Sequence, residues 1–411
     1  MNDISAPLKL LSIVLAGGKG NRLRPLTSHC AKPAVPFAGH YRIIDFVLSN
    51  CINSGCHDVL LLSQYEASGL HRYVQQHWQS NGYPAHIQLI AAPADANTGT
   101  AGAVYQQLDL IASSSATHLC VLSADHVYKM DFRQMLDFHE SKQACLTVAA
   151  IPVPVELAHH FGVIEINSVG RMTGFIEKPS PEQAQQLADQ DGMVLVSMGN
   201  YIFNRHCLLK VVQQDAIQHD SQHDFGHDII PRMFPNEPVY VYDFSANIIP
   251  GETKEQAHYW RDVGTLDAFY QAHMDLLSDC PKVRLSNRFW PIAGPSDALP
   301  PCYISGSGHP QSQIQNSLIS AGCEISNARI SHSVLGPHSR VHDNAQLDHC
   351  VLLSHVEVGA GARLHHCIIA EGCSIAPNCL IGHDTTLDQQ RFERTESGLV
   401  IIPANSRVGY H

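Results

Sequence analysis

Residues 12–23 read SIVLAGGKGNRL, an apolar run that passes directly into a glycine-rich turn with a basic residue near its end. The run Ser12–Ala16 predicts a buried strand, and glycines after it would let backbone N–H groups approach phosphate oxygens closely. Arg22 adds a guanidinium that can bind phosphate through two hydrogen bonds. The turn matches neither the G-x-G-x-x-G fingerprint nor the G-K-[ST] of a P-loop. It therefore favours a nucleoside triphosphate over a dinucleotide.

Short apolar runs alternate with helix-like segments through about the first 280 residues. Because these strands are apolar without alternation, we expect an α/β fold, Rossmann-like, whose mostly parallel sheet is covered by helices on both faces. The further predicted strands are Val59–Ser63, His118–Ser123 and Leu146–Ile151, and the predicted helices include Ala101–Ile111 and Phe132–Ser141.

The sequence pattern changes at about Ser317, where aliphatic residues begin to recur at every sixth position with small residues between them. Such a repeat predicts a parallel β-helix in which each hexad forms one face of a coil. Cys323, Cys373 and Cys379 each follow a repeat aliphatic by four positions, where we expect small side chains that point inward; a ladder of metal ligands is the alternative. The repeat aliphatics are Ile319, Ile325, Leu335, Val341, Leu347, Leu353, Val358, Leu364, Ile369, Ile375, Ile381 and Leu387.

Charge limits the partners of this chain of 411 residues. Its 26 basic and 38 acidic side chains give a net charge of −12, so we expect it to bind neither nucleic acid nor a membrane. An anionic ligand would have to be held by a few placed cations.

The 13 cysteines are odd in number and lack a C-x-x-C pair, which favours reduced thiols in a cytoplasmic protein. The 27 histidines are scattered, and we expect them to be incidental.

Several motifs resemble those of sugar-1-phosphate nucleotidyltransferases, and more narrowly those of the bacterial ADP-glucose pyrophosphorylase (glucose-1-phosphate adenylyltransferase) family. The resemblance implies an enzyme that converts ATP and glucose 1-phosphate to ADP-glucose and pyrophosphate for glycogen synthesis. It also implies a C-terminal left-handed β-helix. The motifs come in the family's order: the glycine-rich turn, Ala31–Ala34, Tyr41–Gly55, Phe175–Pro179, Ser197–Phe203, His223–Gly226 and Tyr259–Thr265.

On this basis we predict three parts of the chain. Residues 1–280 would form the nucleotidyltransferase catalytic domain, and residues 317–411 a left-handed β-helix with a regulatory or oligomerisation role. Residues 281–316, rich in Pro, Gly and Ser, would be the linker. Members of the family are homotetramers and the edges of a β-coil pack well against a partner, so we expect a homotetramer.

Asp125 follows an apolar strand, and acidic groups at the carboxyl ends of parallel strands lie where ligands bind. By resemblance, Asp125 and Asp262 are metal ligands. We expect Mg²⁺ as the cofactor, because hard divalent cations are held by carboxylates and substrate oxygens. The resemblance also implies that Arg22 and Lys32 contact the triphosphate and the leaving pyrophosphate. Arg22, Lys32 and Asp125 are therefore the predicted catalytic residues.

The other predicted site residues would bind the two substrates. By resemblance, Lys178 would hold the phosphate of glucose 1-phosphate, and Glu177 the sugar hydroxyls. Ser197, Gly199, Asn200 and Asp262 would belong to the same pocket. The predicted ATP-binding residues, whose backbone and amide groups can recognise an uncharged adenine, are Leu15, Ala16, Gly17, Gly18, Gln64, Gly99 and Thr100.

The chain departs from the family at a few positions. His29 and Cys30 stand where the family usually has two basic residues that bind anionic activators. Residues 96–103 lack the aromatic pair, the Arg and the Asp of the usual loop. Each lost charge-assisted hydrogen bond would weaken anion binding by about 1.5–3 kcal/mol. We therefore expect weak or absent activation by fructose 1,6-bisphosphate. Ala124 for Gly and His227 for Lys leave the metal carboxylates and the phosphate cations intact.

Three other interpretations stay open. The chain could be a catalytically weak regulatory subunit of a mixed tetramer, although the retained cations and metal aspartates argue against it. It could use UTP or dTTP, although relatives that do so look different around Tyr41–Gly55. A hexapeptide acyltransferase would need a catalytic histidine in the coil, and the upstream domain leaves the coil histidines no necessary role.

Overall fold

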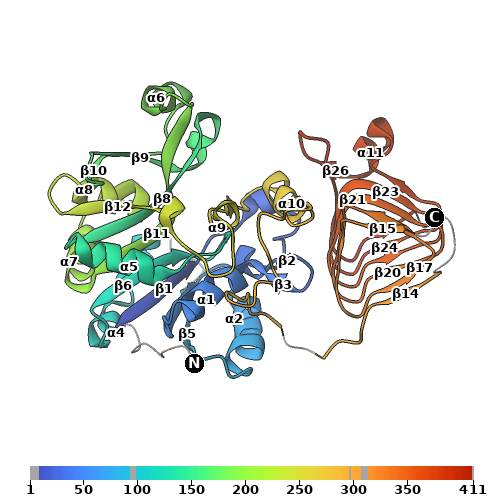
Figure 1. The fold of residues 1–411 in the computed structure, drawn as a ribbon, viewed down its shortest axis with the longest axis horizontal. Helices are drawn as coiled ribbons and strands as arrows, with labels where there is room; N and C mark the ends of the chain where they lie inside the picture. The colour runs from blue at the N-terminus through green and yellow to red at the C-terminus, as the bar shows by residue number, and fades with distance from the viewer. Residues whose placement is uncertain (1–8, 93–98, 296–297, 307–312, 410–411) are drawn as a thin grey trace.

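The structure of this chain is a computed structural model that describes residues 9–92, 99–295, 298–306 and 313–409. Figure 1 shows an N-terminal α/β domain beside a C-terminal stack of coils. The predicted fold class, a mostly parallel α/β sheet followed by a parallel β-helix, is confirmed. Among the described helices, none is long and apolar enough to cross a membrane.

The N-terminal domain is built on a nine-stranded sheet with the path β10-β9-β11-β6-β1-β4-β5, and β8 and β12 lie off this path. Its parallel strands around the centre are β1 (Leu10–Ala16), β4 (Asp58–Ser63), β5 (His86–Ala91) and β6 (His118–Ser123). The other strands are β8 (Leu146–Pro154), β9 (Gly162–Ile166), β10 (Met172–Glu177), β11 (Met193–Asn204) and β12 (Val239–Asp243). Because β1 and β6 are parallel neighbours, Ala16 and Ser123 end at the same edge of the sheet.

Helices cover both faces of this sheet. One face carries α1 (Ile43–Asn53), α2 (Ala67–Val74) and α5 (Phe132–Ser141); the other carries α3 (Thr100–Tyr105), α4 (Leu108–Ser113) and α7 (Arg205–Ala216). Successive strand residues alternate between the two hydrophobic clusters, so Val14 packs under α1 whereas Ile13 packs under α3. The single helix expected over Ala101–Ile111 is two helices, because Gln107 leaves the helical region with φ −109° and ψ 16°.

The C-terminal coils form two sheets of stacked, mostly parallel strands. The first is β14 (Tyr303–Ser305), β17 (Glu324–Ser326), β20 (Arg340–Val341), β22 (Glu357–Val358), β24 (Ser374–Ile375) and β28 (Arg407–Val408). The second runs along β15 (Gln313–Gln315), β18 (Arg329–Ser331), β21 (Gln346–Leu352), β23 (Arg363–Ile369), β27 (Val400–Ile402) and β26 (Glu393–Arg394). Beside them, β16 (Leu318–Ile319), β19 (Val334–Leu335) and β25 (Leu380–Ile381) complete the second sheet.

The hexad pattern predicted the core of these coils well. The repeat aliphatics from Ile325 to Ile381 are buried, Ile319 is partly buried, and the three coil cysteines point into the core as small packing residues. The last repeat position is wrong, because Leu387 lies in α11 (Thr385–Arg391), which leaves the coil and exposes 41% of that side chain.

The segment predicted as a linker is ordered where the structure describes it. Trp290 is buried and donates its indole N–H to Asn50 Oδ1 (3.1 Å) of α1, and the Ala293 N–H donates to Ser49 Oγ (2.9 Å). Further along, β14 and β15 already pair with the next coil, so the β-helix begins before residue 317. The proline- and glycine-rich segment thus packs on α1 instead of forming a free linker.

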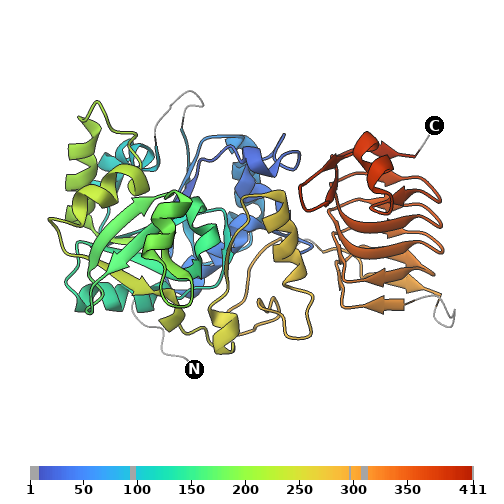
Figure 2. The same ribbon diagram turned by 90° about the horizontal axis from the view of Figure 1, so that it is seen from above.

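Helix α10 (Leu266–Met274) connects the two parts (Figure 2). Phe269 shares a buried cluster with Val351 and Ile368 of the coils. The Tyr270 hydroxyl donates to the carbonyl of His349 (3.0 Å). The coils therefore pack on the N-terminal domain through an apolar contact fixed by a hydrogen bond.

One expectation about the cysteines is wrong. Cys145 and Cys207 form a disulfide, with their Cα atoms 5.6 Å apart. Cys145 directly precedes β8 and Cys207 lies on α7, so the packing of this helix on the sheet brings the two together. The remaining cysteines, all of which fall in the described ranges, are free.

Candidate active site

A cavity of about 520 Å³ opens at the carboxyl ends of β1 and β6. Fourteen of the sixteen predicted site residues line it: Leu15, Ala16, Gly17, Gly18, Lys32, Gln64, Gly99, Thr100, Asp125, Glu177, Lys178, Ser197, Gly199 and Asp262. Segments far apart in the sequence therefore meet at one place. The two exceptions, Arg22 and Asn200, are described below.

The centre of the site is an ammonium group between two carboxylates. Lys32 Nζ donates to Asp125 Oδ2 (2.8 Å) and to Asp262 Oδ1 (2.9 Å), and only 6% of Lys32 is exposed. Burial alone would lower the pKa of Lys32, but the two carboxylates raise it above its usual value. Lys32 therefore stays charged and holds the aspartates together.

Asp125 is kept ionised by its surroundings. Burial alone would raise its pKa, but Lys32 and His126, with hydrogen bonds from Lys32 and the Ser123 hydroxyl, hold the pKa well below its usual range. A carboxylate that is ionised in this way is ready to accept a cation.

A short antiparallel ladder brings the second aspartate to the first. β7 (His126–Tyr128) pairs with β13 (Trp260–Asp262), and Asp262 lies opposite His126. His126 Nε2 lies 3.5 Å from Asp125 Oδ1 and 3.9 Å from Asp262 Oδ1. The ring of Trp260 packs edge-on against His126, with centroids 5.0 Å apart, and fixes its position.

The donor atoms of Asp125, His126 and Asp262 lie within 4.8 Å of one another. Two carboxylates at this spacing fit a hard divalent cation, which prefers oxygen ligands. Sequence reasoning paired the aspartates but assigned no role to His126, although it directly follows Asp125. Only the ladder with β13 reveals its position.

Glu177 and Lys178 form an ion pair of 2.9 Å on another wall of the cavity. Lys178 has a left-handed backbone (φ 47°), its N–H donates to the carbonyl of Phe161 (2.9 Å), and 64% of its side chain is exposed. Glu177 Oε2 would lie 2.8 Å from a Cβ at Gly162 and 2.8 Å from one at Gly226. The carboxylate thus sits between two glycines, and larger residues there would displace it.

An irregular stretch of β11 carries Ser197 and Gly199. The pairing register with β8 shifts between Ser197 and Tyr201, and Gly199 has φ 72°. The Gly199 N–H donates to Ser197 Oγ (3.2 Å), and both residues face the cavity. Asn200 is instead fully buried off the cavity wall, where the Tyr128 hydroxyl donates to its Oδ1 (3.3 Å).

Gly99 and Thr100 at the start of α3 pack on residues 222–225. Thr100 Oγ1 donates to Asp224 Oδ2 (2.9 Å) and accepts from the Phe225 N–H (3.0 Å). A Cβ at Gly99 would lie 2.4 Å from the carbonyl oxygens of Gln222 and His223, so the two segments touch backbone to backbone. Residues 96–98, part of the altered loop, lie outside the described residues.

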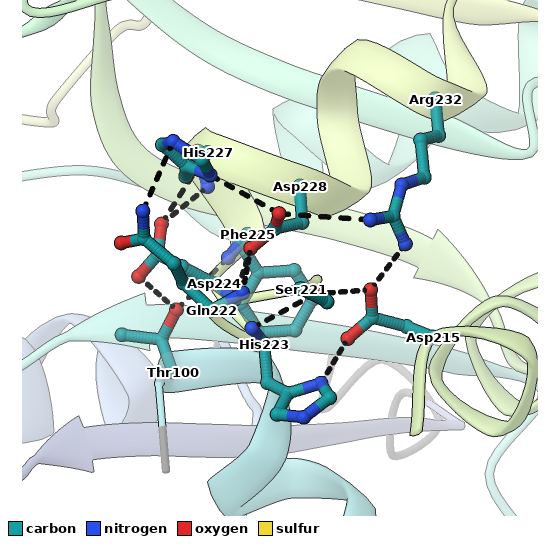
Figure 3. Close-up of polar contacts among 11 residues, drawn as sticks. Thr100, Asp215, Ser221, Gln222, His223, Asp224, Phe225, His227, Asp228 and Arg232 are labelled. Carbon is teal, nitrogen blue, oxygen red and sulfur yellow. Dashed lines mark hydrogen bonds and ion pairs between the residues drawn. The ribbon is translucent and has the colours of Figure 1, made fainter. Parts of the chain in front are cut away.

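A polar network behind this contact fixes residues 221–228 (Figure 3). The buried Asp215 accepts from Arg232 Nη1 (2.6 Å) and Ser221 Oγ (2.7 Å), and pairs with His223 Nδ1 (2.8 Å). Asp228 accepts from the Asp224 N–H (3.1 Å). The network holds Asp224 and Phe225 on the cavity wall, a role that their motif alone did not reveal.

Arg22 is exposed and lies outside the cavity lining, in the short turn η1 (Asn21–Leu23). A Cβ at Gly264 would lie 3.0 Å from Arg22 Nη2 and 3.0 Å from both carboxylate oxygens of Asp262. The guanidinium therefore lies close to Asp262, at the rim of the site.

Comparisons with known proteins agree with this arrangement. The Nucleotidyl transferase family model matches residues 11–279, and the model described as GlmU-like, C-terminal hexapeptide matches residues 300–402. Glucose-1-phosphate adenylyltransferase of Aliivibrio fischeri is 44% identical, over 98% of this chain and 99% of that protein.

Two further relatives with the same name are similar over almost their whole length. The protein of Photobacterium profundum is 42% identical over 98% of this chain and 99% of its own. That of Anaeromyxobacter dehalogenans is 45% identical over 97% of this chain and 98% of its own. With this similarity over both domains and the convergence of Lys32, Asp125 and Asp262, the chain belongs to the glucose-1-phosphate adenylyltransferase family of nucleotidyltransferases.

Proposed function

We propose that this chain transfers the adenylyl group of ATP to glucose 1-phosphate, forming ADP-glucose and pyrophosphate. The observation that carries the proposal is the buried Lys32 held between Asp125 and Asp262, with Lys178 and Glu177 on another wall of the same cavity. Two anionic substrates can meet there only if placed cations neutralise them, because the chain as a whole is acidic.

The reaction needs positioning and charge neutralisation rather than covalent catalysis. A phosphate oxygen of glucose 1-phosphate attacks the α-phosphorus of ATP. The bond from this phosphorus to its bridging oxygen breaks, and pyrophosphate leaves with the electron pair. Lys32 and Arg22 would neutralise the triphosphate and the leaving group, and Lys178 would orient the attacking phosphate.

Asp125 and Asp262 would hold Mg²⁺, since their carboxylates offer the oxygen donors that this ion prefers. When bound, Mg²⁺ neutralises phosphate charge and polarises the reacting phosphoryl group. Lys32 keeps Asp125 ionised and, through its hydrogen bonds to both carboxylates, holds Asp125 and Asp262 close together; His126 lies beside them on β7.

The remaining cavity residues would position the substrates. Gly17 and Gly18 leave room for phosphate oxygens beside the backbone. Gln64 and Thr100 would face the nucleotide, and Glu177 and Ser197 the sugar. The proposed base is adenine, which an amide side chain and backbone groups can recognise without charge.

We further propose that fructose 1,6-bisphosphate activates this enzyme weakly or not at all. Burial raises the pKa of the Cys30 thiol to about 11; Arg42 opposes this effect, and the nearby Glu371 and Glu66 add to it. A neutral thiol with acidic neighbours offers little to an anionic effector. In an effector titration, a several-fold activation below millimolar concentration would overturn this part of the proposal.

The proposed assembly is a homotetramer. Edge strand β14 leaves Tyr303 and Ile304 exposed by 66% and 49%, which suits a surface covered by another chain. Light scattering of the purified protein should give four times the chain mass of 45.1 kDa. A mass corresponding to one chain at micromolar concentration would contradict it.

The experiment for the activity is pyrophosphate release by the purified chain with Mg²⁺, glucose 1-phosphate and each of ATP, UTP, dTTP and GTP. We expect turnover with ATP and at least tenfold less with the others. Asp125→Asn should abolish it. Preference for UTP or dTTP would refute the proposed base, and no turnover with any nucleotide would favour a non-catalytic subunit of a mixed tetramer.

A further inference from the structure

A second cluster of metal-ligating groups lies on the β-helix, away from the Lys32 site. It consists of His332, Asp348, His349 and His365, which come from three successive coils. In the parallel ladder, Ser331 of β18 pairs with Asp348 of β21, and Asp348 pairs with His365 of β23. Within the cluster, His332 is stacked on His349 and Asp348 on His365, and each pair is 17 residues apart.

The carboxylate of Asp348 is the centre of the cluster. Asp348 Oδ1 lies 3.0 Å from His349 Nδ1 and 3.9 Å from His332 Nδ1, and Asp348 Oδ2 lies 3.1 Å from His365 Nδ1. The rings of His332 and His349 are stacked with centroids 4.6 Å apart and planes 13° apart. Three imidazole nitrogens therefore surround one carboxylate.

One of these nitrogens has no hydrogen-bond partner in the described part of the chain. His332 Nδ1 is shielded from solvent and makes no hydrogen bond. Its distance of 3.9 Å from Asp348 Oδ1 is too long for a hydrogen bond, yet it is close to twice the roughly 2.0–2.2 Å of a zinc–ligand bond. The donor atoms of His332, Asp348 and His349 lie within 4.8 Å of one another.

We propose that His332, Asp348 and His349 bind a divalent transition-metal ion of the zinc class, with His365 holding the Asp348 carboxylate in place through its contact of 3.1 Å to Oδ2. Imidazole nitrogens with one carboxylate are ligands that Zn²⁺, Co²⁺ and Ni²⁺ accept, whereas Mg²⁺ prefers oxygen ligands alone. Such an ion would connect two successive coils at the corner that faces α10, where the Tyr270 hydroxyl donates to the carbonyl of His349. The site is separate from the proposed function and does not depend on it.

The backbone conformation at His332 and His349 determines which substitutions can test the site. His332 and His349 have left-handed backbones, with φ 44° and 54°. Asparagine tolerates this conformation better than most residues, and Asn316 occupies the same column one coil earlier with φ 43°. The double variant His332→Asn and His349→Asn therefore removes two ligands and keeps the turn.

A matched control lies at another corner of the same coils. His338 and His355 are stacked 4.8 Å apart with planes 14° apart, and both have φ 59°. Among the described residues, neither forms an ion pair with a carboxylate. His338→Asn with His355→Asn therefore removes two histidines of the same kind without touching the proposed ligands.

The test is Co²⁺ and Zn²⁺ binding to the full, untagged chain in excess Mg²⁺, which occupies carboxylate sites elsewhere. We expect one Co²⁺ per chain with the visible absorption of a nitrogen-coordinated ion, displaced by Zn²⁺. The His332/His349 variant and Asp348→Asn should each weaken binding about tenfold or more. The His338/His355 variant should bind like the wild type. Circular dichroism without metal checks that each variant is folded.

Either of two results would overturn the proposal. One is wild-type Co²⁺ affinity in both the Asp348→Asn chain and the His332/His349 variant. The other is equal loss in the His338/His355 control, which would indicate unspecific binding by surface histidines. A melting temperature that Zn²⁺ raises in the wild type and not in Asp348→Asn would support the site independently, whatever the enzyme activity.

Discussion

Lys32 Nζ lies 2.9 Å from Asp262 Oδ1 although 230 residues of chain separate the two. The lysine follows the first strand and its glycine-rich turn, whereas the aspartate ends β13 near the C-terminal side of the same domain. Their contact closes the site, since it connects the first segment of the fold with one of its last. Lys32 also supplies one positive charge to two partly buried carboxylates, Asp125 and Asp262.

Replacing Lys32 with Met should lower kcat for pyrophosphate release by about 10²–10³, the usual effect of removing one placed group that stabilises developing charge. Methionine keeps the length of the side chain but leaves two carboxylates facing each other, so the melting temperature should also fall. Lys210→Met is the control, because it removes a surface lysine paired with Glu237 at 2.9 Å. A kcat within threefold of wild type for Lys32→Met would exclude Lys32 from the chemistry.

Lys178→Ala tests the proposed sugar-phosphate site. The side chain is largely exposed and pairs with Glu177 alone among the described residues, so folding should not change. Loss of a charge-assisted bond of about 1.5–3 kcal/mol predicts a KM for glucose 1-phosphate that is roughly 10- to 150-fold higher. The KM for ATP should stay within twofold. The control Lys142→Ala changes a partly exposed lysine over Phe138, outside the cavity lining, and should leave both KM values unchanged. A change in the KM for ATP alone would contradict the role proposed for Lys178.

Gly99→Ala tests the contact between α3 and residues 222–225. The new Cβ would lie 2.4 Å from two backbone carbonyl oxygens, which cannot rotate away. Overpacking of this kind costs typically about 1–3 kcal/mol of unfolding free energy, and the shifted wall should raise the KM for ATP. Gly69→Ala in α2 meets no atom within 4 Å and should be neutral or slightly stabilising. Equal urea midpoints for the two variants would mean that residues 222–225 can shift away from α3 without cost, which would contradict the prediction.

The part of the site next to strand ends was predictable from sequence. Ala16–Gly18 and Asp125 follow buried apolar runs, and parallel strands bring such residues to one edge. The parallel coils could also be predicted, because a hexad repeat of aliphatics has few other structural solutions. Lys32, Lys178 and Asp262 required the family resemblance, since no local pattern indicates that these segments meet.

Other features depend on pairing that a sequence does not display. Asn200 follows Gly199 in β11 and is fully buried, and which face of this strand meets the cavity becomes clear only from its pairing with β6 and β8. His126 gains its place from β13, which is paired across more than a hundred residues. The coil histidines look scattered because their regular spacing is the length of a coil, not of a helix turn or a strand.

His273 makes the stability of this protein sensitive to acid. It is fully buried in α10, where its ring lies 4.3 Å from that of Phe37 and 4.6 Å from that of Phe269. Nδ1–H donates to the carbonyl of Phe269 (2.9 Å), and Nε2 accepts from the Ala38 N–H (3.1 Å). Both nitrogens are used by the neutral ring, so protonation would break the second bond.

Burial lowers the pKa of His273 to about 4, although the carbonyl of Phe269 opposes this effect. An unfolded histidine titrates near 6.5, so between these values the unfolded chain binds more protons and stability falls as the pH falls. At pH 5 the contribution of His273 to the free energy of unfolding should be about 2 kcal/mol lower than at pH 8.

His273→Gln, which keeps an acceptor for the Ala38 N–H, should be less stable than wild type at pH 8 but lose less unfolding free energy on acidification. Urea titrations at both pH values measure this difference. The exposed His86→Gln should follow the wild type; if His273→Gln does so too, the buried ring is not the acid-sensitive group.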